Sequence, residues 1–113
     1  MAASATTDID AFAESLPPSG ALIGLDLGTK TIGVAICDAG RRVATPLSVI
    51  RRKKFTADIE SLFELTATSA PAGIVLGLPL NMDGTEGPRA QATRAFARNL
   101  GGHTELPILL WDE

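Results

Sequence analysis

Short apolar segments, separated by glycine, proline and polar residues, follow one another from residue 21 to the end of the chain. Segments of strand length that are rich in Val, Ile and Leu indicate buried strands. Apolar residues spaced three and four apart indicate helices with one buried face. The sequence therefore predicts three consecutive strands, then a helix, a strand, a helix and a last strand. The expected strands are residues 21–27, 31–38, 43–50, 73–78 and 106–111, and Thr56 and Thr85 are the expected caps of the two helices.

The connections between these elements predict a mixed sheet. Gly28-Thr29-Lys30 has the length and the glycine of a hairpin connection. Pro46 lacks the N–H that a central strand needs, so the third strand is expected at a sheet edge. Both faces of the second strand are apolar or small, which indicates helices on both faces of the sheet. With right-handed crossovers, the strand order is 3-2-1-4-5, counted along the chain, and the fold class is α/β.

Residues 1–20 differ in composition from the rest of the chain. They are rich in Ala, Ser and Thr and end in Pro17-Pro18-Ser19-Gly20, a combination that stops a helix. Ile9, Phe12 and Leu16 recur at helical spacing, which allows one short amphipathic helix before that point. We therefore expect an N-terminal extension and linker at residues 1–20 and one domain at residues 21–113.

Composition and charge exclude several classes of protein. A content of 45% hydrophobic and 20% charged residues is typical of a globular domain, and the apolar runs are too short to span a bilayer. Acidic residues fall where the apolar core of a signal peptide would lie, so we expect a cytoplasmic protein without membrane contact. A net charge of -3 argues against bulk binding to nucleic acid but allows a local basic face. Such a face could come from Arg41, Arg42, Arg51–Lys54, Arg89, Arg94 and Arg98, unless these are isolated solvated charges.

Asp26 interrupts the apolar stretch IGLDLGTKTIGVAICD near the end of the first strand, which the topology makes central. Strand interiors disfavour Asp, and a buried carboxylate without a partner is costly. Asp26 could therefore bind a metal ion, or it could accept hydrogen bonds from the amides of the following turn. Gly28 could let a phosphate approach closely or supply a positive φ. Lys30 could reach a phosphate or be an exposed turn lysine.

A second pair of acids, Asp112-Glu113, follows the last apolar strand. Carboxylates from different strands suit Mg²⁺ or Mn²⁺, which take oxygen ligands. One histidine, His103, and one cysteine, Cys37, argue against a zinc site and against Ser-His-Asp or Cys-His catalysis.

The stretch GLPLNMDGTEGPRAQATRAFA, residues 77–97, combines a polar loop with the start of the second helix. The loop holds Asn81, Asp83 and Glu86 above the expected sheet, and the free N–H groups at a helix start suit a phosphate. The alternative is a polar connection that carries only a helix cap.

These segments resemble the YqgF family, also called RuvX, which comprises RNase H-like Holliday junction resolvases associated with maturation of the 5′ end of small-subunit ribosomal RNA precursor. The similar segments are GLDLGTKTIGVAICD, GIVLGLPLNMDGTEGPRA and the terminal WDE, in the family's order over residues 21–113. The resemblance implies an RNase H-like fold in which Asp26 is the first-strand metal ligand and Glu113 the acid after the fifth strand. It implies catalysis by these two residues with two Mg²⁺ or Mn²⁺ ions. The expected substrate-binding residues are Gly28, Thr29, Lys30, Asn81, Asp83, Gly84 and Arg89.

The family continues past this motif with an arginine, a Ser/Thr-rich stretch and a C-terminal helix that carries a third catalytic acid. The chain ends at Glu113, so the expectation is a truncated domain without that helix.

The expected function is metal-dependent hydrolysis of phosphodiester bonds in structured nucleic acid. The specific expectation is 5′-end processing of pre-16S rRNA or resolution of Holliday junctions, by a monomer or homodimer with nucleic acid and the ribosome as partners. Two alternatives remain open. One is a non-catalytic RNA- or ribosome-binding module. The other is a phosphate-binding part of an actin/Hsp70-type ATPase, whose first phosphate loop also reads Asp-x-Gly-Thr, although those enzymes need a second lobe.

Overall fold

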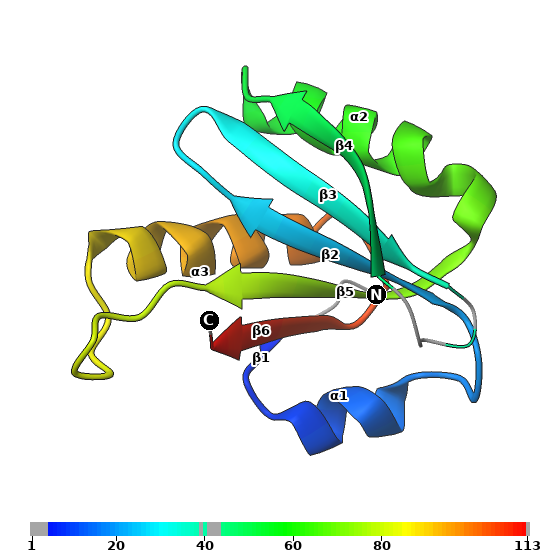
Figure 1. The fold of residues 1–113 in the computed structure, drawn as a ribbon, viewed down its shortest axis with the longest axis horizontal. Coiled ribbons are helices and arrows are strands. Elements are labelled where there is room, and N and C mark those ends of the chain that lie inside the picture. The colour runs from blue at the N-terminus through cyan, green and yellow to red at the C-terminus, as the bar shows by residue number, and fades with distance from the viewer. Residues whose placement is uncertain (1–4, 39, 41–43, 113) are drawn as a thin grey trace.

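A six-stranded mixed sheet forms the centre of the computed structural model, which describes residues 5–38, 40 and 44–112 (Figure 1). The strand order is β1-β6-β5-β2-β3-β4. No helix in these ranges is long and apolar enough to cross a membrane. The strands are β1 (Ala5–Thr6), β2 (Ala21–Leu27), β3 (Thr31–Cys37), β4 (Ala44–Arg51), β5 (Pro71–Leu78) and β6 (Ile108–Asp112). The helices are α1 (Ile9–Ser15), α2 (Phe55–Thr66) and α3 (Pro88–Gly101), with a short 3₁₀ turn at Ala67–Ser69.

The predicted strand order 3-2-1-4-5 is confirmed as β4-β3-β2-β5-β6, with β2 in the centre. The prediction of five strands was wrong, because β1 adds a sixth strand beside β6. Ala5 pairs with Ile108 and Thr6 with Leu109 in parallel register. Residues 1–20 are therefore not only an extension and linker, since part of them belongs to the sheet. Two residues are too few to show a strand periodicity in the sequence.

Helices α2 and α3 cover one face of the sheet and enclose the main core (Figure 1). Alternate residues of each strand point into this core, as the pleat of a strand requires. On β2 these are Ile23, Leu25 and Leu27, which are at most 8% exposed. They meet Ile59 and Leu62 of α2, Phe96 and Leu100 of α3, and the buried side chains of β5 and β6.

Helix α1 packs on the opposite face, at the end where β5 begins. Phe12 of α1 is 4% exposed. A Cβ atom built on Gly73 would lie 2.8 Å from Leu16 and 3.1 Å from Phe12, so glycine is needed there for the helix to lie against the sheet. Helices on both faces were expected, and this is confirmed, but α1 covers only one end of its face.

Both expected helix caps were wrong. Helix α2 has Lys54 at its N-cap without a side-chain hydrogen bond, and α3 has Gly87 there. The hydroxyl of Thr85 instead donates a hydrogen bond to Asp83 within the preceding loop. Pro88 is in the first turn of α3, as predicted. Proline is tolerated there because a backbone N–H at this position would have no partner within the helix.

Candidate active site

Asp26 lies on the sheet face opposite α2 and α3, and its side chain is exposed. The alternation along β2 accounts for this, because Leu25 and Leu27 point into the core on either side of it. No hydrogen bond or ion pair joins the side chain of Asp26 to another residue within the described ranges. The expectation of a buried carboxylate was therefore wrong. The alternative of an Asp bonded to the turn amides is also wrong for Gly28, whose amide donates to the carbonyl of Thr31 at 2.8 Å.

Gly28 does not supply the positive φ that the hairpin reading expected. The described glycines with positive φ are Gly20 and Gly84. At Gly28 the constraint is close packing, since a Cβ atom would lie 3.1 Å from the carbonyl oxygen of Thr31. The β2–β3 connection itself is confirmed, and it leaves Thr29 and Lys30 exposed.

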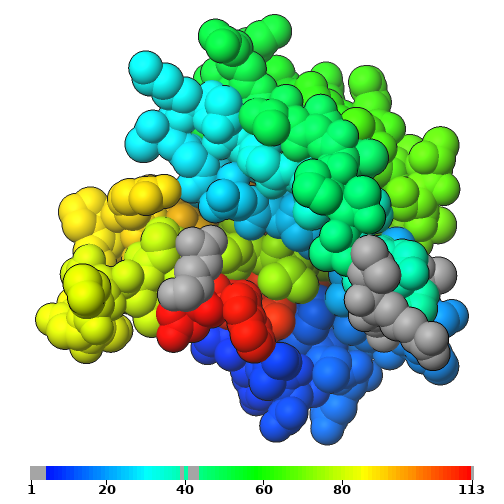
Figure 2. Space-filling view, viewed as in Figure 1, coloured from blue at the N-terminus to red at the C-terminus, as the bar shows by residue number. Residues whose placement is uncertain are grey.

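A groove with a volume of about 470 Å³ runs over Asp26 on the open sheet face, and we call it the Asp26 groove. Gly33 of β3 pairs with Asp26. On the other side, Leu76 of β5 pairs with Leu25, so the next residue of β5, Gly77, lies beside Asp26. Both strands that flank Asp26 thus present glycine beside it. In Figure 2, β2 and β5 form the floor of a recess between β3–β4 on one side and β6 on the other. The carboxylate is therefore accessible to a large ligand from the open side. Further lining residues are Gly24, Val34, Ala35, Pro46, Ser48, Val49, Val75 and Trp111.

Two arginines hold the turn that follows Asp26. Nη1 of Arg52 donates to the carbonyl of Gly28 at 2.6 Å, and Nη2 of Arg89 donates to the carbonyl of Leu27 at 3.4 Å. The guanidinium of Arg52 also lies 5.9 Å from the ring centre of Phe96 in α3. Arg89 was expected to bind substrate, and the structure places it on the turn, with its side chain exposed. Membership of a basic run, residues 51–54, was the one feature of the sequence that pointed to Arg52.

The loop of residues 79–87 after β5 holds Asn81, Asp83 and Gly84, which were expected to bind substrate. The loop is closed by its own hydrogen bonds. The amide of Asn81 donates to the carbonyl of Thr85 at 2.8 Å, and the amide of Gly84 donates to the carbonyl of Asn81 at 2.9 Å. Gly84 has a φ of 84°, which favours glycine. The hydroxyl and the amide of Thr85 both donate hydrogen bonds to the Asp83 carboxylate. These bonds lower the pKa of that carboxyl, and the hydroxyl has the larger effect.

Replacing Thr85 with alanine is expected to raise the pKa of Asp83 part of the way back to its ordinary value near 3.8. The hydroxyl bond at 2.6 Å is lost, whereas the amide bond at 3.0 Å can remain. Because the pKa of Asp83 is depressed in the folded protein, its contribution to stability is present above that ordinary value and is lost as the pH falls through the depressed pKa. Titration of the side-chain carboxyl by NMR measures the change. Thr85→Ser keeps the hydroxyl and should keep the low pKa, and identical titration of the alanine variant would contradict this account.

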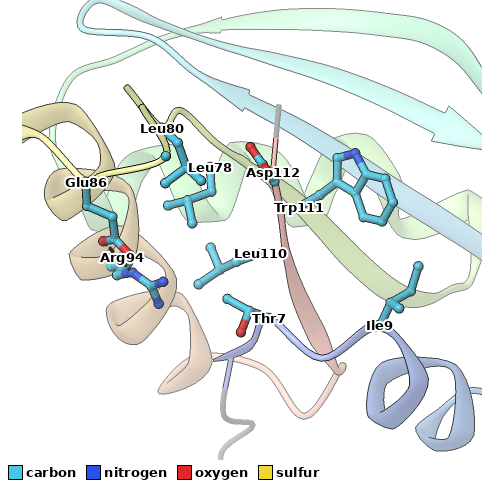
Figure 3. A pocket seen from close by; sticks show the side chains of 10 residues that line it. Thr7, Ile9, Leu78, Leu80, Glu86, Arg94, Leu110, Trp111 and Asp112 are labelled. Atoms are coloured by element: carbon cyan, nitrogen blue, oxygen red, sulfur yellow. Dashed lines mark hydrogen bonds and ion pairs between the residues drawn. The ribbon is translucent and has the colours of Figure 1, made fainter. Parts of the chain in front are cut away.

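Asp112 does not lie in the Asp26 groove. It lines a separate cavity of about 370 Å³, the Asp112 pocket, together with Leu78, Leu110 and Gly84 (Figure 3). Trp111 lines both this pocket and the Asp26 groove, whereas Asp112 does not line the Asp26 groove. At the rim of this pocket, Nε of Arg94 lies 2.7 Å from Oε1 of Glu86, and the ion pair lowers the pKa of Glu86 and raises the pKa of Arg94.

Glu113, the second expected metal ligand, lies outside the described residues. Within the described ranges, no three His, Cys, Asp or Glu side chains are grouped so that they could hold a metal ion. Among the described residues, Asp26 is the one that supplies a carboxylate to this groove. An exposed oxygen ligand without a protein partner fits a hard divalent cation as one ligand of a larger set.

His103, which was interpreted as a loop residue, follows α3 and lies beside Phe55, with 5.4 Å between the ring centres.

The mixed sheet, its strand order and the aspartate at the end of the central strand define an RNase H-like α/β domain. The chain belongs to the RuvX family, because the family model described as "RuvX: Holliday junction resolvase" matches residues 20–113.

Curated relatives agree with this assignment. The chain is 63% identical over 106 residues to a protein of Paracoccus denitrificans, an alignment that covers 94% of this chain and 67% of the relative. It is 66% identical over 105 residues to a protein of Cereibacter sphaeroides, with coverages of 93% and 66%. With a protein of Rhodopseudomonas palustris it shares 65% identity over 97 residues, with coverages of 86% and 60%. All three carry the name "Putative pre-16S rRNA nuclease". The chain thus spans about two thirds of the length of the first two relatives.

Proposed function

We propose that this protein is a metal-dependent nuclease that hydrolyses phosphodiester bonds in structured nucleic acid. The observation that carries the proposal is the exposed carboxylate of Asp26 in an open groove, at the carboxyl end of the central strand of the sheet. In open α/β sheets this end of the strands is where ligands bind. Membership of the RuvX family and the names of the relatives support the same activity.

The proposed substrate is the 5′ region of pre-16S rRNA, processed in the cytoplasm during ribosome assembly. The names of the relatives favour this RNA, whereas the family description favours a four-way DNA junction. Both substrates are polyanions with a branched or folded shape, so the groove must admit a phosphodiester backbone. The glycines on both sides of Asp26 leave the space that such a backbone requires.

The proposed cofactor is Mg²⁺ or Mn²⁺, held by Asp26 and by Glu113, the latter outside the described part of the chain. When bound, such ions activate a water molecule and stabilise the charge that develops on the phosphate oxygens. The chain's own residues bind and orient the substrate. Lys30 is exposed in the turn after Asp26 and attracts the phosphate backbone. Arg52 and Arg89 fix the carbonyls of that turn and so hold its position relative to β2.

A cleavage assay on the full-length protein tests this function. We expect a 5′-extended 16S precursor RNA to be cut in the presence of Mg²⁺ or Mn²⁺, with no cleavage in EDTA and recovery when the metal is added back. A four-way DNA junction of similar length serves as the competing substrate and separates the two activities. Cleavage that persists undiminished in EDTA would overturn the metal-dependent mechanism.

A non-catalytic RNA-binding module is the second candidate. It is favoured by the single carboxylate that the described residues bring to the Asp26 groove. RNA binding that depends neither on divalent metal nor on Asp26, in a full-length protein that cleaves neither substrate, would favour this candidate.

A further inference from the structure

Trp111, the one tryptophan of the chain, lies on the same sheet face as Asp26. Its side chain is 50% exposed, which is unusual for the largest apolar side chain of a small domain. It belongs to β6, where it pairs with Gly77 of β5. Trp111 and Asp26 both line the Asp26 groove. An exposed aromatic ring therefore shares the cavity of the proposed catalytic carboxylate.

The spacing across the sheet places Trp111 close to Asp26. Only β5 separates β2 from β6. Neighbouring strands lie about 4.8 Å apart, so the backbones at Asp26 and Trp111 are roughly 10 Å apart. The residue of β5 between them is Gly77, which has no side chain to obstruct the path. A nucleotide adjacent to a phosphodiester at Asp26 can reach the indole across this floor.

Positive charge lies on the other side of Asp26. Val49 pairs with Gly33, so this part of β4 continues the row that contains Asp26. Arg51, two residues further along β4, faces the same side by alternation and is exposed. Lys30 is exposed in the adjacent turn. The open face thus presents cations, the carboxylate and an aromatic ring in this order, which complements the phosphates and one base of a nucleic-acid strand.

We propose that Trp111 is a base-binding subsite that stacks on an unpaired nucleobase next to the phosphodiester held at Asp26. This inference rests on the proposed nuclease function. An exposed aromatic ring on a sheet reads bases that are splayed out of a helix, because bases within a duplex already have both faces stacked. Stacking is tolerant of base identity, since every base has a π face. The subsite thus selects single-stranded nucleotides at the cleavage point.

Fluorescence of Trp111 reports directly on this subsite. The experiment uses the full-length protein in EDTA, so that no cleavage occurs, and takes the difference in emission between the parent and Trp111→Phe to isolate this indole. The probes are a single-stranded ribo-oligonucleotide, an abasic oligonucleotide of equal length and charge, and a blunt RNA duplex. We expect saturable quenching of the Trp111 emission by the single strand, and none by the abasic strand or the duplex.

Binding of the variants completes the test. Trp111→Ala should weaken binding of the single strand about 10-fold while leaving the abasic strand unaffected, and Trp111→Phe should keep most of the affinity. Leu47→Ala removes an exposed apolar side chain of β4 that does not line the Asp26 groove, and it should leave the affinity unchanged. Unchanged urea unfolding midpoints establish that the variants fold.

Three results would overturn the subsite. They are equal quenching by the abasic strand, unchanged affinity of Trp111→Ala, and emission typical of a buried indole that no probe alters, which would mean that another segment covers Trp111. The nuclease function is judged separately. If metal-dependent cleavage persists while Trp111→Ala binds normally, only the subsite fails. If the single strand quenches Trp111 but no substrate is cut with metal, the nuclease function fails and the subsite stands.

Discussion

Asp26→Asn is expected to abolish cleavage by the full-length protein, with a fall in rate of more than roughly 100-fold at saturating Mg²⁺. The amide has nearly the same size as the carboxylate but carries no negative charge, so it is a poor ligand for a hard cation. Because the Asp26 side chain is exposed and makes no hydrogen bond to another described residue, the substitution removes no side-chain hydrogen bond from the described fold. The free energy of unfolding should therefore stay within about 0.5 kcal/mol of the parent.

Asp10→Asn provides the matched control for this substitution. Asp10 is an exposed carboxylate in the first turn of α1 and does not line the Asp26 groove. The same chemical change there should leave cleavage unaltered. Rates are compared at several Mg²⁺ concentrations, because a weakened metal site can be partly refilled at high metal. Full activity of Asp26→Asn at all of them would exclude Asp26 from the reaction.

Leu76→Ala is expected to lower the free energy of unfolding by about 2–5 kcal/mol. Leu76 is 0% exposed and lies in β5, in register with Leu25 of β2 and Leu110 of β6. Its removal leaves a cavity at the middle of the main core, where the neighbouring strands cannot easily collapse. Urea unfolding followed by circular dichroism measures the change. A loss of this size is a large share of the stability of a domain of this length.

Leu47→Ala is the control for Leu76→Ala, because it makes the same substitution at a leucine that lies outside the core. Leu47 lies in the edge strand β4 and is 41% exposed. The same atoms are deleted, yet the loss should be below about 1 kcal/mol, because little apolar surface leaves the core. Similar losses for the two variants would mean that the described packing of β5 is wrong.

The main sheet was predictable because its strands bury one or two whole faces, which imposes a periodic apolar pattern on the sequence. β2 and β5 show this pattern over seven and eight residues. β1 has two residues and is defined by its partner β6, so no local pattern could reveal it. The predictions that Thr56 and Thr85 cap the helices were wrong for a related reason. A threonine hydroxyl has several nearby acceptors and donors, and local sequence does not decide among them.

The candidate site was predictable where one residue departed from its surroundings. Asp26 stood out in an apolar strand, but its exposure depends on how far α1 extends over that face, which is a tertiary property. Arg52 and Trp111 were not predicted as site residues. Arg52 reaches Gly28 only through the β3–β4 pairing, 24 positions away in sequence. Trp111 ends an apolar run, and such a run predicts a buried strand. The structure buries residues 108–110 of this run but leaves Trp111 exposed.

The N-terminal segment before residue 20 bears on how this domain can be handled as a fragment. The family match begins at residue 20, so a fragment cut at that boundary would lose β1 and α1 together. The backbone edge of β6 at Ile108 and Leu109 would then be unpaired, and the apolar surface under Phe12 would be open to water. Open strand edges beside apolar surface promote association between chains. The apparent boundary of the family is thus a poor boundary for the folded unit.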